Sequence, residues 1–145
     1  MRMSERVADT SPVRIDSAFC VDHGFALVAH GDGWAEVACE IRDRHVNRHG
    51  NAHGGLIAAL LDTSMGVATR AGGDVDNLGT ATLNVSYLRP ARGRLIARAS
   101  VLRSGGKLAF CEAVARDGGG AVVATASAVF AVARLPREPG PDGAR

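Results

Sequence analysis

Alternation of polar and apolar residues predicts strands across the second half of the chain. Residues 80–87 alternate strictly, with hydroxyl or amide side chains at the even positions and apolar or aromatic ones at the odd positions. Three apolar runs follow at 95–102, 108–116 and 121–133, separated by glycine-containing turns. A period of two indicates a half-buried strand, and an almost unbroken apolar run such as 121–133 is typical of a strand covered on both faces.

The first half of the chain predicts a β-hairpin preceded by a short helix. The apolar-rich runs 24–30 and 34–42 flank the dipeptide Asp32-Gly33. Asp-Gly between two such runs is a hairpin signal, because glycine adopts the positive φ that a tight turn requires. We expect the short helix within 13–20.

The segment 53–70 has a different pattern. Leucine, isoleucine, methionine, valine and alanine recur there so closely that a helix would be apolar nearly all round. Such a helix is normally buried, and Gly72 and Gly73 are expected to end it. The predicted order is two strands, one helix and four strands. A single buried helix needs a sheet to wrap it, so the predicted fold class is α+β.

Length and composition fit one domain with a substantial core. The chain has 145 residues, of which 46% are hydrophobic, and we place the domain at 14–135. Residues 1–13 are expected to form a flexible arm. Residues 136–145, which hold three of the five prolines, are expected to form a disordered tail.

Charge, hydropathy and cysteine content narrow the class of protein. The formal net charge of +2, from 17 basic and 15 acidic residues, is too balanced to indicate nucleic-acid binding. No apolar stretch approaches the roughly 20 residues of a membrane span, and the N-terminus lacks the apolar core of a secretory signal. Three cysteines without a framework spacing indicate free thiols in a reducing compartment. These features predict a soluble, cytoplasmic protein.

Two glycines open the predicted helix directly after a polar loop. Gly54 and Gly55 follow the segment 43–52, in which polar side chains dominate. A helix start presents free backbone N–H groups and the positive end of the helix dipole, and glycines let a ligand oxygen approach those donors closely. The pattern indicates an anion or oxyanion site. The alternative is that the two glycines only permit close packing.

Asp62 lies inside the most apolar segment of the chain. Because an unpaired buried carboxylate is costly, it needs a hydrogen-bonding partner, solvent in a cleft or a functional role. It follows Gly54 by eight residues, about 12 Å along a helix axis, which is too far for one copy to act on a carbonyl at its own helix start. If both features serve one site, a second, antiparallel copy supplies the carboxylate, and a two-fold dimer with shared active sites follows.

The residues around this helix resemble those of a known family. The pattern N-x-x-G-x-x-H-G-G, with an aspartate seven residues later, is similar to that of hotdog-fold acyl-CoA thioesterases of the phenylacetate-degradation (PaaI-type) branch. In this chain the pattern consists of Asn47, Gly50, His53, Gly54, Gly55 and Asp62. The resemblance continues through 84–90 and 105–110 and covers about residues 20–134.

The resemblance implies a hotdog fold, in which a curved antiparallel sheet wraps a long helix, and subunits that form dimers and commonly tetramers. It implies hydrolysis of an acyl-CoA, with the N–H of Gly54 as the oxyanion donor, helped by His53. Asn47 would orient the thioester or the attacking water, and Thr80 would help to position that water. Asp62 of the partner subunit would act as general base or nucleophile.

The resemblance also implies where the CoA part of the substrate lies. Relatives hold the nucleotide near strand ends and turns, which assigns Arg89, Arg103 and Lys107 to CoA, together with Gly55. No cofactor is expected, and the chain contains neither GxxxxGK[ST] nor a strand-borne GxGxxG. The acyl group stays open between aryl-acyl and medium-chain groups.

Other signals are assigned to structure. His45, His49 and His53 are spaced by four, but they fall in a loop without a carboxylate or cysteine to complete a set, so we predict no metal site. Cys111 lies within a strand pattern and is interpreted as a core residue. Tyr87, like Trp34, is interpreted as packing.

Two other functions fit the same scaffold. A hotdog enoyl-thioester hydratase usually pairs a histidine with a carboxylate on a differently spaced helix motif, which this chain does not show. A non-catalytic acyl-CoA-binding module would have no need of Asp62 in an apolar helix. Hydration of an enoyl-CoA would favour the first, and binding without turnover would favour the second.

Overall fold

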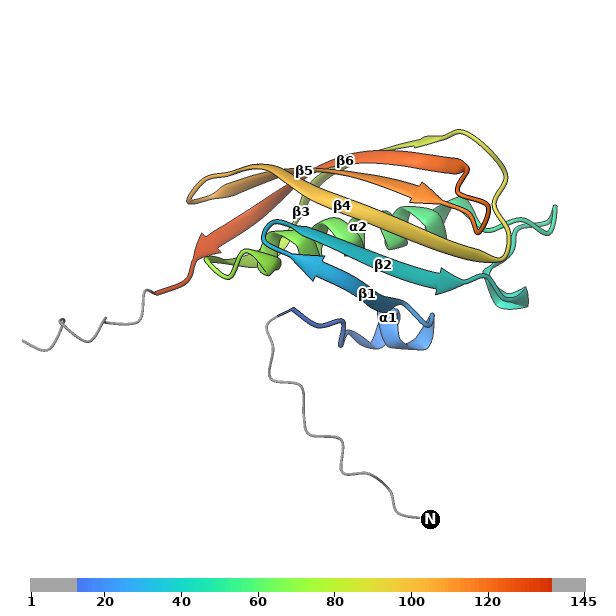
Figure 1. The fold of residues 1–145 in the computed structure, drawn as a ribbon, viewed down its shortest axis with the longest axis horizontal. Coiled ribbons are helices and arrows are strands. Elements are labelled where there is room, and N and C mark those ends of the chain that lie inside the picture. Colours follow the sequence, from blue (N-terminus) through green and yellow to red (C-terminus); the bar gives the residue numbers. More distant parts are fainter. Residues whose placement is uncertain (1–12, 137–145) are drawn as a thin grey trace, which may run out of the picture.

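The computed structural model describes residues 13–136 and shows a six-stranded antiparallel sheet curved around one long helix (Figure 1). The elements are α1 (Ala18–Asp22), β1 (Ala26–Gly31), β2 (Trp34–Glu40), the 3₁₀ helix η1 (Asp43–His45), α2 (Gly54–Ala71), β3 (Val75–Tyr87), β4 (Arg94–Ser104), β5 (Leu108–Arg116) and β6 (Val122–Arg134). The strand order across the sheet is β1-β2-β4-β5-β6-β3. This is the α+β architecture expected from the sequence. The predicted arm and tail fall almost entirely outside the described residues, although Val13 itself is buried in the core.

Residues at both ends of α2 explain where the helix begins and where it stops. The His53 side chain caps its first turn by accepting a hydrogen bond from the N–H of Gly55. Just past its last turn, Gly73 has a φ of 78°, the left-handed conformation that commonly ends helices. Among the described residues, no helix combines the length and apolar character that crossing a membrane requires.

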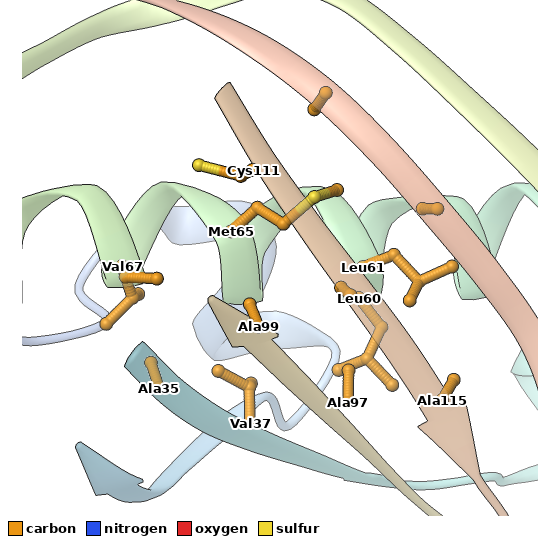
Figure 2. Close-up of a cluster of buried hydrophobic side chains, with 14 of the residues drawn as sticks. Ala35, Val37, Leu60, Leu61, Met65, Val67, Ala97, Ala99, Cys111 and Ala115 are labelled. Carbon is orange, nitrogen blue, oxygen red and sulfur yellow. The ribbon is translucent and has the colours of Figure 1, made fainter. Parts of the chain in front are cut away.

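The core combines large side chains of α2 with a sheet face on which alanine is frequent. Leu60, Leu61 and Met65 are almost completely buried, and Figure 2 shows them between α2 and strands that carry alanines. The buried strand alanines include Ala35, Ala97, Ala99, Ala109, Ala113 and Ala115. Because alanine adds so little volume, the helix approaches the sheet closely, and the leucine and methionine side chains fill the remaining space.

Strand β3 forms one edge of the sheet, where it pairs with β6 along its length of 13 residues. Every residue over 78–82 is exposed, including Leu78, which is 63% exposed. A long edge strand presents unpaired N–H and C=O groups, and such an edge can pair with another chain. Strand β3 is therefore open to solvent along this edge.

The structure differs from the predicted elements at three places. Helix α1 begins at Ala18, because Ser17 caps it by accepting a hydrogen bond from the Cys20 N–H. Strand β3 begins at Val75, five residues before the alternating run, because an exposed edge strand does not need apolar residues. The expectation that the last run is covered on both faces was wrong. Strand β6 alternates between buried and partly exposed positions, and Ser127 on its outer face is exposed.

Candidate active site

The aspartate inside α2 meets a hydroxyl of the neighbouring strand. Thr80 Oγ1 donates a hydrogen bond to Asp62 Oδ1 at 2.6 Å. Asp62 is half-buried and Thr80 is exposed, so the carboxylate lies at the border between the core and solvent. The structure thus brings these two predicted site residues together. It also explains how an apolar helix accommodates Asp62, which has both a donor and contact with water.

A cavity of about 290 Å³ opens beside this pair. Residues of α2 and β3 line one side of it, and residues 14–17 before α1, with Cys20 in α1, line the other. Cys20 Sγ lies 3.5 Å from Thr63 Oγ1, which ties α1 to α2. The segment before the hairpin is therefore part of the wall around the carboxylate.

The start of α2 presents one backbone donor that has no acceptor. His53 Nδ1 accepts from the Gly55 N–H at 2.8 Å, so neutral His53 carries its ring proton on Nε2. The His53 carbonyl accepts from the N–H groups of Leu56 and Ile57 at 3.0 and 3.2 Å. Within the described part of the chain, nothing accepts a hydrogen bond from the Gly54 N–H. The Gly54 N–H is therefore available to donate to an incoming oxygen, whereas the Gly55 N–H already donates to His53.

Asn47 holds the loop before α2 through one end of its amide. Its Oδ1 accepts from the His49 N–H at 2.9 Å and from the Asn51 N–H at 3.2 Å. These two donors identify the oxygen, so Nδ2 is the end of the amide that is left to donate. Asn47 and Gly54 line one cavity of about 450 Å³. The predicted donors thus lie around a common space at the helix start.

The two parts of the predicted site are separated along α2. Gly54 opens the helix and Asp62 lies eight residues later, about 12 Å along the axis. Their cavities share no lining residue. A single copy of the chain therefore presents the free N–H of Gly54 in one place and the carboxylate of Asp62 in another.

The predicted CoA-binding cations also lie in two separate places on one copy of the chain. Arg89 lines the cavity at the start of α2, together with Asn47 and Gly54. Arg103 lies instead near the end of β4, and Lys107 lies in the exposed turn before β5, where its carbonyl accepts from the Val132 N–H at 2.9 Å. The structure does not bring these three cations together within one copy.

Sequence reasoning missed the contact that Tyr87 makes with the helix start. This residue is 53% exposed, and its hydroxyl donates to the Gly54 carbonyl at 2.6 Å. A Cβ at Gly54 would lie 3.3 Å from the Tyr87 hydroxyl oxygen. In the period-two pattern Tyr87 is an ordinary inward position, so nothing in its spacing identifies this contact.

A contact between His45 and His23 anchors the loop that precedes α2. His45 is 3% exposed, its Nδ1 accepts from the Arg42 N–H at 3.1 Å, and its Nε2 lies 3.1 Å from His23 Nδ1. Burial, followed by nearby positive charge, lowers the pKa of His45. The His45 carbonyl accepts from the His53 N–H at 2.8 Å, which connects the pair to the cap of α2.

The histidines spaced by four do not converge. His45 is buried in its contact with His23, whereas His53 caps α2 and His49 is exposed. Within residues 13–136, no three histidine, cysteine or acidic side chains form a group that could hold a metal ion. Cys111 is buried on the inner face of the sheet, where burial raises the pKa of its thiol to about 12.

A larger cavity of about 680 Å³ lies on the outer face of the sheet, between β2, β4 and β5. Charged side chains of both signs line it. Arg98 forms a 2.7 Å ion pair with Glu36 and stacks on Trp34, with its guanidinium carbon 4.4 Å from the ring centroid. None of the predicted site residues lines this cavity.

The central helix, the sheet that wraps it and the donor at the helix start define the class of protein as a hotdog domain. A sequence model of the thioesterase superfamily matches residues 49–124, more than half of the 145 residues. The chain belongs to this family, as the sequence motif predicted.

Individual relatives agree with this family. The Halobacterium salinarum protein VNG_1336C, named only as a candidate esterase, is 48% identical over 71 residues, which cover 47% of each chain. The medium/long-chain acyl-CoA thioesterase YigI of Salmonella typhimurium is 32% identical over 95 residues, covering 55% of this chain and 61% of YigI. The chain thus matches about half of the length of these two relatives.

A solved structure supports the predicted branch. A point mutant of the phenylacetic acid degradation protein PaaI from Thermus thermophilus superposes with a TM-score of 0.72 at 26% identity. The match covers 79% of this chain and 98% of that one. The hotdog fold expected from the sequence is confirmed, and family membership supports thioester hydrolysis as the class of reaction.

Proposed function

We propose that this protein hydrolyses an acyl-CoA thioester to a free acid and CoA. The family and the similarity to YigI, which is named as an acyl-CoA thioesterase, support this reaction. The observation that carries the proposal is the pair of features on α2, the unused N–H of Gly54 and the carboxylate of Asp62 held by Thr80. Thioester hydrolysis needs a donor for the oxyanion and a group that activates water, and these residues supply one of each.

The active site is formed by two copies of the chain. Because Gly54 and Asp62 lie about 12 Å apart on one helix, an antiparallel second copy is needed to bring a carboxylate to the helix start. The exposed edge of β3, which carries Thr80, offers the surface along which two copies would pair. The proposed assembly is a homodimer with two shared sites, and a dimer of dimers is the larger assembly expected.

The chemistry at each shared site follows from the donors. The thioester carbonyl oxygen accepts from the Gly54 N–H, and Asn47 Nδ2 is a second donor within the same cavity. Asp62 of the partner subunit removes a proton from water, whose oxygen bonds to the carbonyl carbon and places negative charge on the carbonyl oxygen. Collapse of this intermediate breaks the C–S bond, and the CoA sulfur takes up the proton. One oxyanion donor is typically worth about 3–4 kcal/mol.

A covalent route uses the same residues. Asp62 of the partner subunit would attack the carbonyl carbon and expel CoA, and water would then open the resulting anhydride. Both routes require the carboxylate and the Gly54 N–H. Trapping with ¹⁸O-labelled water distinguishes them, because only the covalent route places the label in Asp62 during a single turnover.

The positions of the cations suggest that both copies bind CoA. Across β3, β6 and β5, Thr80 pairs with Phe130, and Phe130 pairs with Ala109. Ala109 therefore lies roughly 10 Å across the sheet from Thr80, at two strand spacings, and Lys107 precedes it by two residues. In the proposed dimer, Arg89 of one copy and the partner's Lys107 would flank the same site and meet the phosphates of CoA.

The cavity beside Asp62 is the proposed place for the acyl group. Its volume of about 290 Å³ exceeds the roughly 150 Å³ of an apolar cavity that binds benzene. By volume alone, an aryl-acyl group or a medium-length chain is small enough for it. Substrates with larger acyl groups should be turned over more slowly.

Mixing two inactive variants tests the shared site. Asn47→Asp keeps the oxygen that binds the loop but removes the Nδ2 donor, and Asp62→Asn removes the carboxylate. After unfolding and refolding in a one-to-one mixture, half of the dimers are mixed, and each mixed dimer has one intact site. Activity should return to about a quarter of the wild-type rate. If the mixture stays as inactive as its components, the site is not shared between copies.

A further inference from the structure

Two consecutive peptide groups at the start of α2 are held by hydrogen bonds on both sides of Gly54. The carbonyl of Gly54 and the N–H of Gly55 belong to one peptide group. Tyr87 Oη donates to that carbonyl at 2.6 Å, and His53 Nδ1 accepts from that N–H at 2.8 Å. The preceding peptide group is held through its carbonyl, which accepts from Leu56 at 3.0 Å and from Ile57 at 3.2 Å. Its N–H, that of Gly54, is the one left to a ligand.

Glycine makes such restraint necessary. A glycine backbone samples a wider range of φ and ψ than other residues do, so an unrestrained Gly54 could turn its N–H away from the cavity. The two clamped peptide groups remove this freedom without using the donor itself. An oxyanion donor is effective only when it already points to where the charge develops.

Tyr87 also sets the space around the donor. Its ring lies so close to Gly54 that a Cβ there would be 3.3 Å from both Cζ and Oη. The same ring lines the cavity that contains Asn47 and Arg89. With 53% of its surface exposed, Tyr87 lies where this cavity meets solvent.

We propose that Tyr87 is a positioning residue, whose hydroxyl fixes the Gly54–Gly55 peptide group and thereby aims the Gly54 N–H at the thioester oxygen. The role rests on the proposed thioesterase function. Tyr87 comes from the end of β3, whereas Gly54 begins α2, so the contact joins the strand to the helix start. Through it, the sheet determines the geometry of the oxyanion donor.

The variant Tyr87→Phe tests this role, because it keeps the ring and removes only the hydroxyl. Since misplacing a reacting group by a fraction of an ångström to 1 Å costs up to about a hundredfold, we expect kcat to fall by roughly 5- to 20-fold. KM should stay within about twofold, because the interaction is made in the transition state rather than in the bound substrate. The matched control is Ser86→Ala, which removes an exposed hydroxyl from the adjacent position of the same strand and should leave both constants unchanged.

A second readout needs no turnover. In ¹⁵N-labelled protein without ligand, amide hydrogen exchange at Gly55 should be several-fold faster in Tyr87→Phe than in wild type and unchanged in Ser86→Ala. Faster exchange with a lower kcat and an unchanged KM supports the role. A kcat within twofold of wild type, a rise in KM alone, or unchanged Gly55 exchange overturns it. If wild type hydrolyses no acyl-CoA, the thioesterase proposal fails, and unchanged exchange would separately refute the clamp.

Discussion

The hydrogen bond between Thr80 and Asp62 gives a prediction whose size follows from the structure. In Thr80→Val a methyl group replaces the hydroxyl that donates to Asp62 at 2.6 Å, and the shape of the side chain is kept. A hydrogen bond to a charged group contributes about 1.5–3 kcal/mol. Because Thr80 is exposed, water screens the bond, and we expect the lower end of this range. The bond holds Asp62 in the orientation in which it meets the water, and about 1.4 kcal/mol lost from that orientation corresponds to a tenfold change in rate, so kcat should fall by roughly tenfold.

The assay is release of free CoA thiol from the best acyl-CoA substrate, with thermal unfolding measured in parallel. Thr80→Ser keeps the hydroxyl and should stay within about threefold of the wild-type rate. Thr82→Val makes the same substitution two residues away at an exposed threonine, and it should behave like wild type. The reasoning is refuted if Thr80→Val is as active as wild type, or if Thr82→Val loses activity to the same extent.

Three further predictions concern stability and reactivity. Leu61→Ala removes a side chain that is 0% exposed and should lower the free energy of unfolding by about 3–5 kcal/mol in a denaturant titration; a loss below about 1 kcal/mol would mean that α2 is not wrapped by the sheet. The pKa of His45 is lowered in the folded state, so as the pH falls this histidine is protonated in the unfolded chain before it is protonated in the folded one. The free energy of unfolding should therefore decline as the pH falls below about 6.5. The urea midpoint at pH 7.5 and pH 5 checks this, and His45→Gln should show a smaller decline than wild type. Since burial raises the pKa of Cys111 to about 12, a disulfide reagent should label this thiol only after unfolding, and rapid labelling of the native protein would show that it is accessible.

The sequence predicted those parts of the site that break a local pattern. Asp62 is conspicuous because it interrupts an apolar helix, and Gly54 because it opens that helix after a polar loop. The helix itself was predicted nearly to its ends, because burial on all sides leaves little freedom in its composition. The start of β3 was missed, since the exposed edge of a sheet accepts polar residues that look like a loop.

Contacts between distant residues could not be predicted in this way. Tyr87 and Gly54 lie 33 positions apart, and His23 and His45 lie 22 positions apart. No periodicity relates such pairs, because their contacts arise only when the sheet folds around the helix. The tertiary structure also shows which end of the Asn47 amide is free, which depends on two backbone donors in its own loop.

The central claim is that Asp62 is the catalytic carboxylate of an acyl-CoA thioesterase, and one substitution tests it most directly. Thiol release from a panel of aryl and aliphatic acyl-CoAs would be compared for wild type, Asp62→Asn and the control Asp74→Asn, which changes an exposed carboxylate that lines neither cavity of the proposed site. Removing a positioned base should cost about a hundredfold or more, so Asp62→Asn should lose nearly all activity while Asp74→Asn keeps it. Full activity in Asp62→Asn would contradict the role of Asp62 as the catalytic carboxylate. A wild type that binds the panel without turnover would contradict the whole claim and favour a binding module.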